Sequence, residues 1–499
     1  MAPAPETASR DFLEIIDELW EKNSKTYIKS PNKFLSDLNE IFADKKLFVS
    51  LHSSKVLPGY LVCARCMVQN VLSPEYIPIS YTITSGSTAT TRETTGFFRD
   101  CFGDYVTDNH NLSERHCYKM VMVPGAVEWW LDDFNRAHTT VLCNTDTDED
   151  AVKGCSSPLP VKISSFIAKV FANGSPELKP NTVVDVYGYL SSAMPAEVGD
   201  NSYKHFDVHV LRISNVNDVA PELESSSYYR LCIRFNLVKD VSSVLGSIAS
   251  ADIFVNFLVS NTYSRAGDTL PLCSMPLNIV GVEDSHAVNS IIGMIEQLMP
   301  KVKILTVTPE LLSQRRYAPF KDYETDDLLQ GDLQLSNGTV LVIDETQFSS
   351  GYFPVSGFVE ENLKFLQIPM DVDYNIVILS RKESKLFQTP FRIPLQPCRT
   401  SLSISDLQLQ RNFLQQSREA VKTVTLTEDI SKKIQDNFVA LCSTLDGKTD
   451  KAAFLHKMLI MSRLTAASSG SSCLELMHYE YAQRIFAANS SALDAWRSR

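Results

Sequence analysis

The chain lacks the short signatures of most enzyme families. It contains no H-E-x-x-H, no G-x-S-x-G and no G-x-G-x-x-G, so no motif indicates a zinc protease, a nucleophile-elbow hydrolase or a dinucleotide-binding enzyme. Its nine histidines are dispersed along the chain. We therefore expect no catalytic residue, no metal ion and no cofactor.

Long apolar runs and basic clusters are also missing. The first ten residues, MAPAPETASR, have no apolar signal core, and no uninterrupted apolar run approaches a membrane span. The net charge of −12 and the pI near 5.3 provide no broad positive field for a phosphate backbone. The sequence thus predicts no membrane partner and argues against direct binding of duplex DNA, although a local basic groove stays open.

A second cysteine pair that would complete a zinc site is absent. The eleven cysteines are odd in number and scattered, which indicates reduced thiols in a cytosolic or nuclear protein. Only Cys63 and Cys66 form a C-x-x-C, and the nearest further ligands are His116 and Cys117. Because structural zinc needs four ligands, two thiols on an ordinary strand are the more frequent explanation.

What is present is an ordinary globular composition in a long chain. With 499 residues, 44% hydrophobic and 21% charged, the chain is too long for one core, and about three or four domains are expected. Two apolar helical stripes come first, and short strand-like runs follow from about Leu57. The stripes are Phe12, Ile15, Ile16, Leu19, Trp20 and Phe34, Leu35, Leu38, Ile41, Phe42, and the runs are 60–68, 76–83, 183–190 and 206–213.

The strand-like runs favour an OB-like barrel over residues 51–215. The glycine in VYGYLSS (186–192) is typical of a bent strand in a small closed barrel. Two polar stretches, 85–96 and 145–154, are expected to be exposed, mobile insertions. Such barrels often bind single strands through aromatic and basic side chains, although packing is the commoner role of the aromatics. The candidates here are Tyr187, Tyr189, Tyr203 and Lys204.

The middle of the chain reads as a linker, a strand and a helix. NDVAPELESSS (217–227) is the linker, and YYRLCIRFNL (228–237) alternates apolar and polar residues strictly, which predicts a strand. IASADIFVNFLVSNTY (248–263) predicts a mostly buried helix that ends near Ser264.

The stretch GTVLVIDET (338–346) organises the second half. Its apolar run is typical of a strand buried in a parallel sheet, and Asp344 and Glu345 follow at the carboxyl end, where open α/β sheets bind ligands. In nucleotide hydrolases such acids serve the magnesium ion and the attacking water. Upstream, strand 276–281 and helix 286–300 have the strand–glycine–loop–helix arrangement of a P-loop.

The loop between them lacks the groups that hold phosphate. Gly281 is followed by Glu283 and Asp284, while the second glycine and the lysine are absent. One like-charge pair about 4 Å apart costs about 1 kcal/mol in water and about 4 kcal/mol near a protein surface. A helix N-terminus attracts an anion by only about 0.3–1 kcal/mol. Because repulsion is the larger effect, we expect this loop not to bind ATP tightly.

The later elements continue in the order of an ATPase domain. A strand at 301–308, a loop at 321–338 and a strand at 373–380 would place Ser380 where related ATPases contact the γ-phosphate. Three helices then close the chain. They are expected at 426–442, 452–464 and 474–486, the last two joined by a Gly/Ser loop, 466–473.

The order and spacing of several strings carry a family resemblance. They are LVSNTYSRAGDTLPL (258–272), PLNIVG, PFKDYETDDLLQGDLQL (319–335), GTVLVIDET and PLQPC (394–398), with FLEIIDELW, GYLVCARCMV, PLPV and VVDVYGYLSS more sparsely before them. The chain resembles the AAA+ core and lid of minichromosome maintenance helicase subunits, and more closely the minichromosome maintenance complex-binding protein family. The resemblance implies a nuclear, also cytoplasmic, protein that binds helicase subunits during DNA replication in the cell cycle. It further implies a role in assembly, storage or chromatin release of the hexamer and in sister-chromatid cohesion.

One departure from the helicase subunits is informative. Those subunits have GxxxxGK[ST] and a Ser-Arg-Phe arginine finger, whereas this chain has GVEDSHA (281–287) and FRIPLQPC (391–398). We therefore expect a non-catalytic, degenerate AAA+-like helicase assembly chaperone that acts through differential affinity for open and closed states. The expected remnants of the nucleotide site are Gly281, Glu283, Asp284, Asp344, Glu345 and Ser380.

The expected fold class is a multidomain combination of α+β and α/β parts. The domains are an N-terminal helical segment (1–50), an OB-like β domain (51–215), a linker with a strand (216–245), an AAA+-like α/β domain without a functional P-loop (246–400) and a helical lid-like domain (401–499). Two alternatives stay open. One is a residual ATPase with its phosphate loop in SNTYSRAGDT (260–269), and the other is a single-strand-binding protein that uses the barrel with Arg230 and Arg234.

Overall fold

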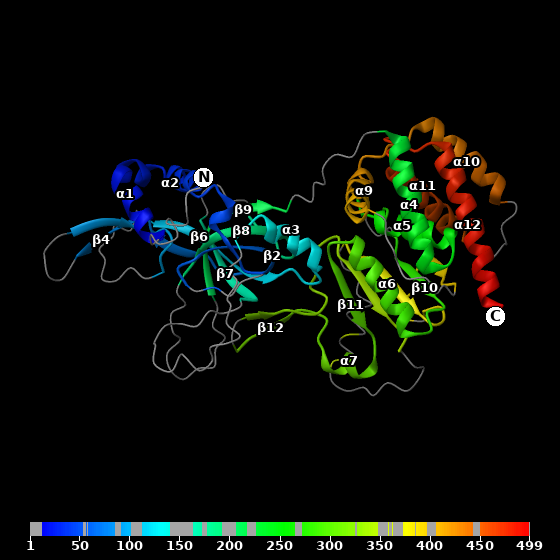
Figure 1. Cartoon of the computed structure of the whole chain (residues 1–499), viewed down its shortest axis with the longest axis horizontal. Coiled ribbons are helices and arrows are strands. Elements are labelled where there is room, and N and C mark those ends of the chain that lie inside the picture. The colour runs from blue at the N-terminus through cyan, green and yellow to red at the C-terminus, as the bar shows by residue number, and fades with distance from the viewer. Residues whose placement is uncertain are drawn as a thin grey trace.

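The computed structural model shows a mixed α/β protein, as expected, with two halves that meet side by side (Figure 1). The first half is built on a β-barrel, and the second on a parallel sheet with helices. The structure describes residues 12–52, 56, 58–84, 91–100, 112–139, 163–171, 177–191, 206–216, 226–264, 272–324, 327–347, 358, 362, 373–384, 386–396, 406–442 and 450–498.

The two expected N-terminal helices are confirmed as α1 (Phe12–Lys29) and α2 (Pro31–Ile41). Their apolar stripes, apart from the exposed Ile41, face a cluster rich in aromatic side chains, to which the barrel strands also contribute. Phe12 stacks on Tyr189 with ring centroids 4.7 Å apart, and Trp20 meets Phe34 edge-on at 5.1 Å. The helices therefore cover one end of the barrel.

Five strands of the first half close into a barrel, and three of them lie close to the predicted runs 60–68, 183–190 and 206–213. The predicted run 76–83 instead forms two short strands outside the barrel, and the remaining two barrel strands were not predicted. Each of the five pairs with two of the other four, and these pairs are antiparallel except β7 with β9. At Gly188 the register shifts, and a Cβ there would collide with the carbonyl of His209, which explains the glycine in the bent strand. The barrel strands are β2 (Leu61–Val71), β6 (Leu112–Met122), β7 (Ser165–Phe171), β8 (Val183–Leu190) and β9 (Phe206–Asn215).

Part of the expected mobile insertion at 85–96 is instead a strand. β5 (Thr91–Thr95) pairs with β4 (Ser80–Thr84), and Thr94 and Thr95 are buried. Their hydroxyls donate to Asp17 and to the carbonyl of Ile79, so a serine- and threonine-rich string is ordered by side-chain hydrogen bonds. The acidic stretch 145–154 lies outside the described residues. The remaining small elements of this half are η2 (Lys45–Leu47), β1 (Val49–Ser50), β3 (Glu75–Pro78) and α3 (Glu128–Arg136).

The second half has a five-stranded parallel sheet, whose strand order is β11-β14-β15-β10-β16. β14 is buried on both faces, as its continuous apolar run predicts. The sheet strands are β10 (Leu277–Val280), β11 (Val302–Thr306), β14 (Val340–Asp344), β15 (Asn375–Ser380) and β16 (Phe391–Pro394). The helices are α4 (Ser227–Leu245), α5 (Ile248–Val259), α6 (Ser285–Leu298), α7 (Pro309–Gln314), α9 (Leu407–Ala420), α10 (Glu428–Cys442), α11 (Lys451–Ser469) and α12 (Leu476–Arg497).

The predicted strand at 228–237 is wrong, because these residues begin helix α4. Ile233, Leu237 and Val241 are buried at helical spacing in the large core, whereas Phe235 between them is exposed. The apolar residues counted as one strand face thus belong to two sides of a helix. Helix α5 is confirmed but ends at Val259, before the predicted Ser264.

Two predicted loops contain regular structure. The loop 321–338 holds part of a hairpin of β12 (Phe320–Asp322) and β13 (Asp327–Leu329). The Gly/Ser loop 466–473 is helical up to Ser469, because its alanines are buried and its serines donate to carbonyls one turn earlier.

Within the described part of the chain, no single helix is long and apolar enough to cross a membrane. Helices α4 and α5 are long and apolar enough only when taken together, but the chain bends by 116° between them, and nearly all of α5 is buried in the core.

Candidate functional site

The carboxyl ends of β10, β14 and β15 bring four predicted remnants to one edge of the sheet: Gly281, Asp344, Glu345 and Ser380. The amide of Val282, next to Gly281, donates to the carbonyl of Ser380 over 3.1 Å. The amide of Glu345 donates to Leu379 over 2.9 Å. The edge that binds nucleotides in related folds is therefore present.

The two acids at this edge are buried and bonded to their own neighbourhood. Asp344 accepts hydrogen bonds from the amide and the hydroxyl of Thr346, at 2.9 and 2.6 Å. Glu345 Oε1 accepts from the hydroxyl of Ser384 at 2.9 Å. Burial raises the pKa of Glu345, the Ser384 hydrogen bond partly opposes this, and the Asp344 carboxylate adds to the rise.

Ser380 is likewise buried and hydrogen-bonded to a neighbouring strand. Its hydroxyl is buried and accepts a 2.8 Å hydrogen bond from Asn278 Nδ2, which also donates to the carbonyl of Ile378. These bonds tie β10 to β15 inside the sheet. The hydroxyl proton of Ser380 stays available to a phosphate, but the side chain is buried, so a ligand would have to reach into the sheet to contact it.

In the loop after β10, an acidic side chain caps the N-terminus of the helix that follows. Asp284 is the N-cap of α6, and its Oδ1 accepts from the amide of Ala287 at 2.7 Å. Glu283 is exposed beside it. One of the amides that cradle phosphate in a P-loop is therefore already bonded to a carboxylate.

A tryptophan from the last helix lies against the same loop. Gly281 has φ +81°, and a Cβ placed there would lie 2.7 Å from Nε1 of Trp496 in α12. Sequence reasoning missed this residue, because more than two hundred positions separate it from the loop. Its indole occupies space directly over the glycine that a phosphate-binding loop keeps open.

The zinc alternative finds no support in the structure. Cys63 contributes to the aromatic cluster under α1 and α2, whereas Cys66 lies in the barrel core. Residues three apart on a strand point to opposite faces, so the two thiols cannot share an ion. Burial raises the pKa of both thiols well above its usual value. Among the residues that the structure describes, no three metal-ligating side chains come together.

Of the four side chains considered for single-strand binding, the structure describes Tyr187 and Tyr189, and both are buried in packing contacts, which is the commoner role of such aromatics. Tyr189 stacks under Phe12, and Tyr187 packs against Phe48 and bonds to the ring of His138 at 3.1 Å. Tyr203 and Lys204 lie outside the described residues.

The two arginines of that alternative are also held by the helical region. Arg234 is buried and paired with Asp252 at 2.9 and 3.0 Å. Arg230 donates to Gln416 at 2.9 Å. Both guanidinium groups are therefore engaged in hydrogen bonds within the helical region.

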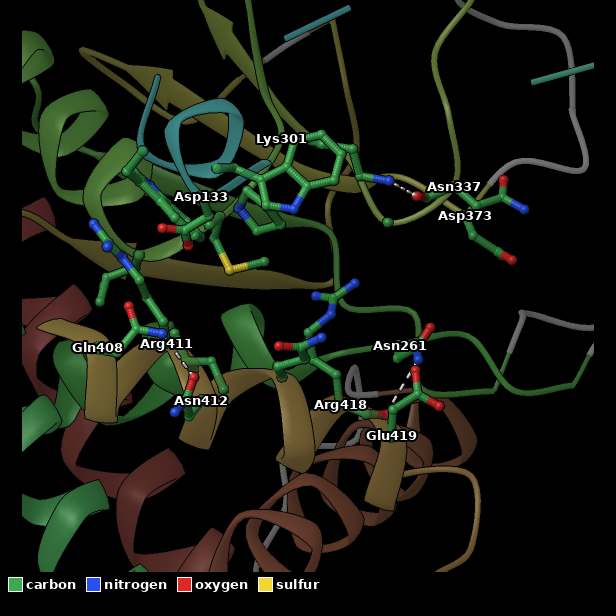
Figure 2. Close-up of a pocket in the computed structure, with 18 of the residues that line it drawn as sticks. Asp133, Asn261, Lys301, Asn337, Asp373, Gln408, Arg411, Asn412, Arg418 and Glu419 are labelled. Atoms are coloured by element: carbon green, nitrogen blue, oxygen red, sulfur yellow. Dashed lines mark hydrogen bonds between the residues drawn. The ribbon is translucent and has the colours of Figure 1, made fainter. Parts of the chain in front are cut away.

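A cavity of about 500 Å³ lies where the two halves meet (Figure 2). Its cations are bound to the protein: Arg411 stacks 3.8 Å from the ring centroid of Trp129 and donates to the carbonyl of Gln297 at 2.7 Å. Burial lowers the pKa of Arg411. Lys301 reaches the carbonyl of Asn337 at 2.6 Å. The cavity is a polar seam without a nucleophile–base pair, and its cations hold elements together.

Backbone bonds continue this seam. Gly125 and Val302 lie in contact, and the amide of Val302 donates to the carbonyl of Gly125 at 2.7 Å. Trp129 Nε1 donates to the carbonyl of Glu296 at 2.8 Å. The barrel and the parallel sheet are thus joined by main-chain as well as side-chain contacts.

Fold and site define a mixed α/β protein that joins a closed five-strand barrel to a parallel sheet with helices. The chain matches the family model described as Mini-chromosome maintenance replisome factor over residues 48–153 and 132–491. It belongs to this family, which confirms the resemblance seen in the sequence.

Relatives align with most of the chain and with most of their own length. The Mini-chromosome maintenance complex-binding protein of Salmo salar is 22% identical, and the alignment covers 91% of each chain. That of Danio rerio is 24% identical, again over 91% of each chain. That of Gallus gallus is 24% identical over 95% of this chain and 94% of its own.

Proposed function

We propose that this protein binds subunits of the mini-chromosome maintenance complex and regulates assembly, stability or chromatin release of the replicative helicase. The observation that carries the proposal is the family match, which spans both halves from residue 48 to residue 491. The relatives that match over nine-tenths of the chain are named for binding that complex.

We further propose that the two halves are OB-like and AAA+-like. Counted along the chain, the barrel strands pair in the order first, second, third, fifth, fourth and back to the first, with the third and fifth parallel. This is the pairing of OB barrels. The parallel sheet has the order fifth, first, fourth, third, second, which is how AAA+ cores arrange their strands. Such a protein would occupy a subunit interface as a mimic.

The mimic acts without nucleotide hydrolysis in this proposal. Three features support it: the loop has no lysine, its Asp284 caps α6, and Trp496 lies over Gly281. Without hydrolysis, the protein shifts the helicase only by binding one state more tightly than another. We also place it in the nucleus, with a role in sister-chromatid cohesion.

Two measurements test these proposals separately. Purified full chain mixed with recombinant helicase subunits is expected to co-elute with them in gel filtration at moderate salt. A chain that elutes alone with every subunit, singly and combined, would refute the binding proposal.

Isothermal titration with magnesium-ATP tests the absence of catalysis. No heat of binding is expected at micromolar ATP, and no phosphate release above a buffer control. Micromolar binding with turnover would leave subunit binding intact but remove the non-catalytic proposal.

A further inference from the structure

Helix α4 carries a second apolar face that the core does not use. Tyr228, Leu231 and Phe235 follow one another at helical spacing and are 77%, 46% and 69% exposed. The opposite side of the helix, with Leu237 and Val241, is buried. When a helix is apolar on two sides and only one is buried, the exposed side is a candidate binding surface for a partner.

Leu231 and Phe235 of this face line one wall of an apolar groove. The facing wall is α12, which presents Met477, and Ile248 at the start of α5 lies at one end; these side chains are 59% and 69% exposed. The groove has a volume of about 830 Å³, and α11 contributes Thr465 and Ser469 to it. In Figure 1 these helices lie at the end of the molecule away from α1 and α2.

The floor of the groove is polar but internally satisfied. Arg234 and Asp252 form a two-pronged ion pair, and Tyr481 donates to the same carboxylate at 2.6 Å. Arg234 Nε also donates to Ser468 at 2.9 Å. Because these charges neutralise one another, the floor is fixed and does not select the charge of a ligand.

Charged side chains that can interact with a ligand lie on the rim of the groove. Lys239 of α4 and Arg484 of α12 are exposed, and neither forms an ion pair within the described part of the chain. The rim also carries one exposed carboxylate, Glu475, at the N-cap position of α12, so it holds two cations and one anion. On a protein of net charge −12, this groove therefore has a basic rim.

We propose that the groove between α4 and α12 binds an acidic amphipathic helix of a helicase subunit. Its apolar side chains lie against Leu231, Phe235 and Met477, and its carboxylates pair with Lys239 and Arg484. This inference rests on the proposed function and names the kind of segment that is bound. The groove wall from Ser227 to Ser242 is about 22 Å long at 1.5 Å per residue, which suits a helix of about 14 residues.

Two synthetic peptides test the chemistry directly. Both are 14-residue helices with leucines at i, i+3, i+4 and i+7 spacing, and the remaining positions carry glutamate in one and lysine in its twin. By fluorescence anisotropy with the full chain, the glutamate peptide is expected to bind at least about ten-fold more tightly. The double variant Lys239→Glu/Arg484→Glu is expected to reverse that preference. Equal binding of the twins, or no binding of either, overturns the proposal.

A pair of variants locates the binding. Phe235→Glu is expected to weaken the glutamate peptide at least about ten-fold, because it places a carboxylate in the apolar wall. Val439→Glu is the matched control: Val439 is 64% exposed on α10 and does not line the groove. An equal loss in both variants, or in neither, contradicts the assignment. Thermal unfolding checks that both variants fold.

The same variants separate this inference from the proposed function. If the wild-type chain co-elutes with helicase subunits and Phe235→Glu does not, both stand. If Phe235→Glu co-elutes as well as wild type, the groove assignment is wrong and the proposed function survives. If the wild-type chain retains no subunit, the proposed function is wrong. A wild-type dimer that Phe235→Glu turns into a monomer in sedimentation would assign the groove to a second copy instead.

Discussion

Gly281, in the degenerate loop, has no room for a side chain. Its backbone is in the left-handed region at φ +81°, and Trp496 fills the space beside it. We expect Gly281→Ala to lower the free energy of unfolding by about 1 kcal/mol or more, from backbone strain and from displacement of the indole. Chemical denaturation measures the change.

A double variant and a control make this result specific. In a Trp496→Ala background the cost of Gly281→Ala is expected to shrink, because only the backbone part remains. Gly293 lies in α6, and a Cβ added there would have no atom within 4 Å, so Gly293→Ala is expected to stabilise by about 0.5–1 kcal/mol. An equal cost of Gly281→Ala in both backgrounds would refute the contact.

Glu345 is expected to make stability depend on pH. Burial raises its pKa in the folded chain, so the folded state favours the protonated form more than the unfolded chain does. Its contribution is fully present below the unfolded pKa, about 4.3, and is lost as pH rises through the raised folded value.

The neutral variant Glu345→Gln keeps an acceptor for Ser384 without the charge. We expect its melting temperature to exceed that of wild type at pH 7, and the difference to vanish toward pH 4. Glu283→Gln, in the exposed neighbouring loop, serves as the control. A difference between Glu345→Gln and wild type that does not change with pH would show that burial has no such effect.

At the scale of elements, the start of α6 depends on one side chain. Asp284 accepts the hydrogen bond of Ala287, and we expect Asp284→Ala to lower the free energy of unfolding by about 1 kcal/mol. Asp284→Asn keeps the acceptor and is expected to cost little. Hydrogen exchange at Ala287 and Val288 reports the fraying. Equal stability of the alanine and asparagine variants would contradict the cap.

Helix α4 shows why the strand prediction at 228–237 failed. Its residues alternate along the chain, and the same residues also satisfy a helical period, so the pattern fits both structures. Packing against α5 and α11 decides between them, because it buries Ile233 and Leu237 together and leaves Phe235 outside. The pattern of Tyr228, Leu231 and Phe235 was visible in the sequence as a helical stripe and would have pointed to the groove.

At the scale of the whole molecule, the seam between the halves is the feature to test. Arg411 stacks on Trp129 of the first half while it bonds to Gln297 of the second. We expect Arg411→Ala to speed hydrogen exchange at Val127 and Val302, whose amides cross the seam, by several-fold. Lys432→Ala, exposed on α10, is the control. Unchanged exchange in Arg411→Ala would mean that the backbone bonds alone hold the seam.

The sequence alone determined those helices and strands whose pattern of buried residues is complete within one short segment. A continuous apolar run made β14 a buried strand, and the stripes of α1, α2 and α6 made helices, because each pattern is complete within one segment. The missing lysine and the acids at 283 and 284 were equally plain in one loop.

Only the tertiary structure decided what distant segments do to one another. It placed Trp496 over Gly281, closed five strands into a barrel and set α4 beside α12 to form the groove. These contacts join residues far apart in the chain, where no period or spacing links them. Long-range packing decides these contacts, because it buries one face of a segment and leaves another exposed.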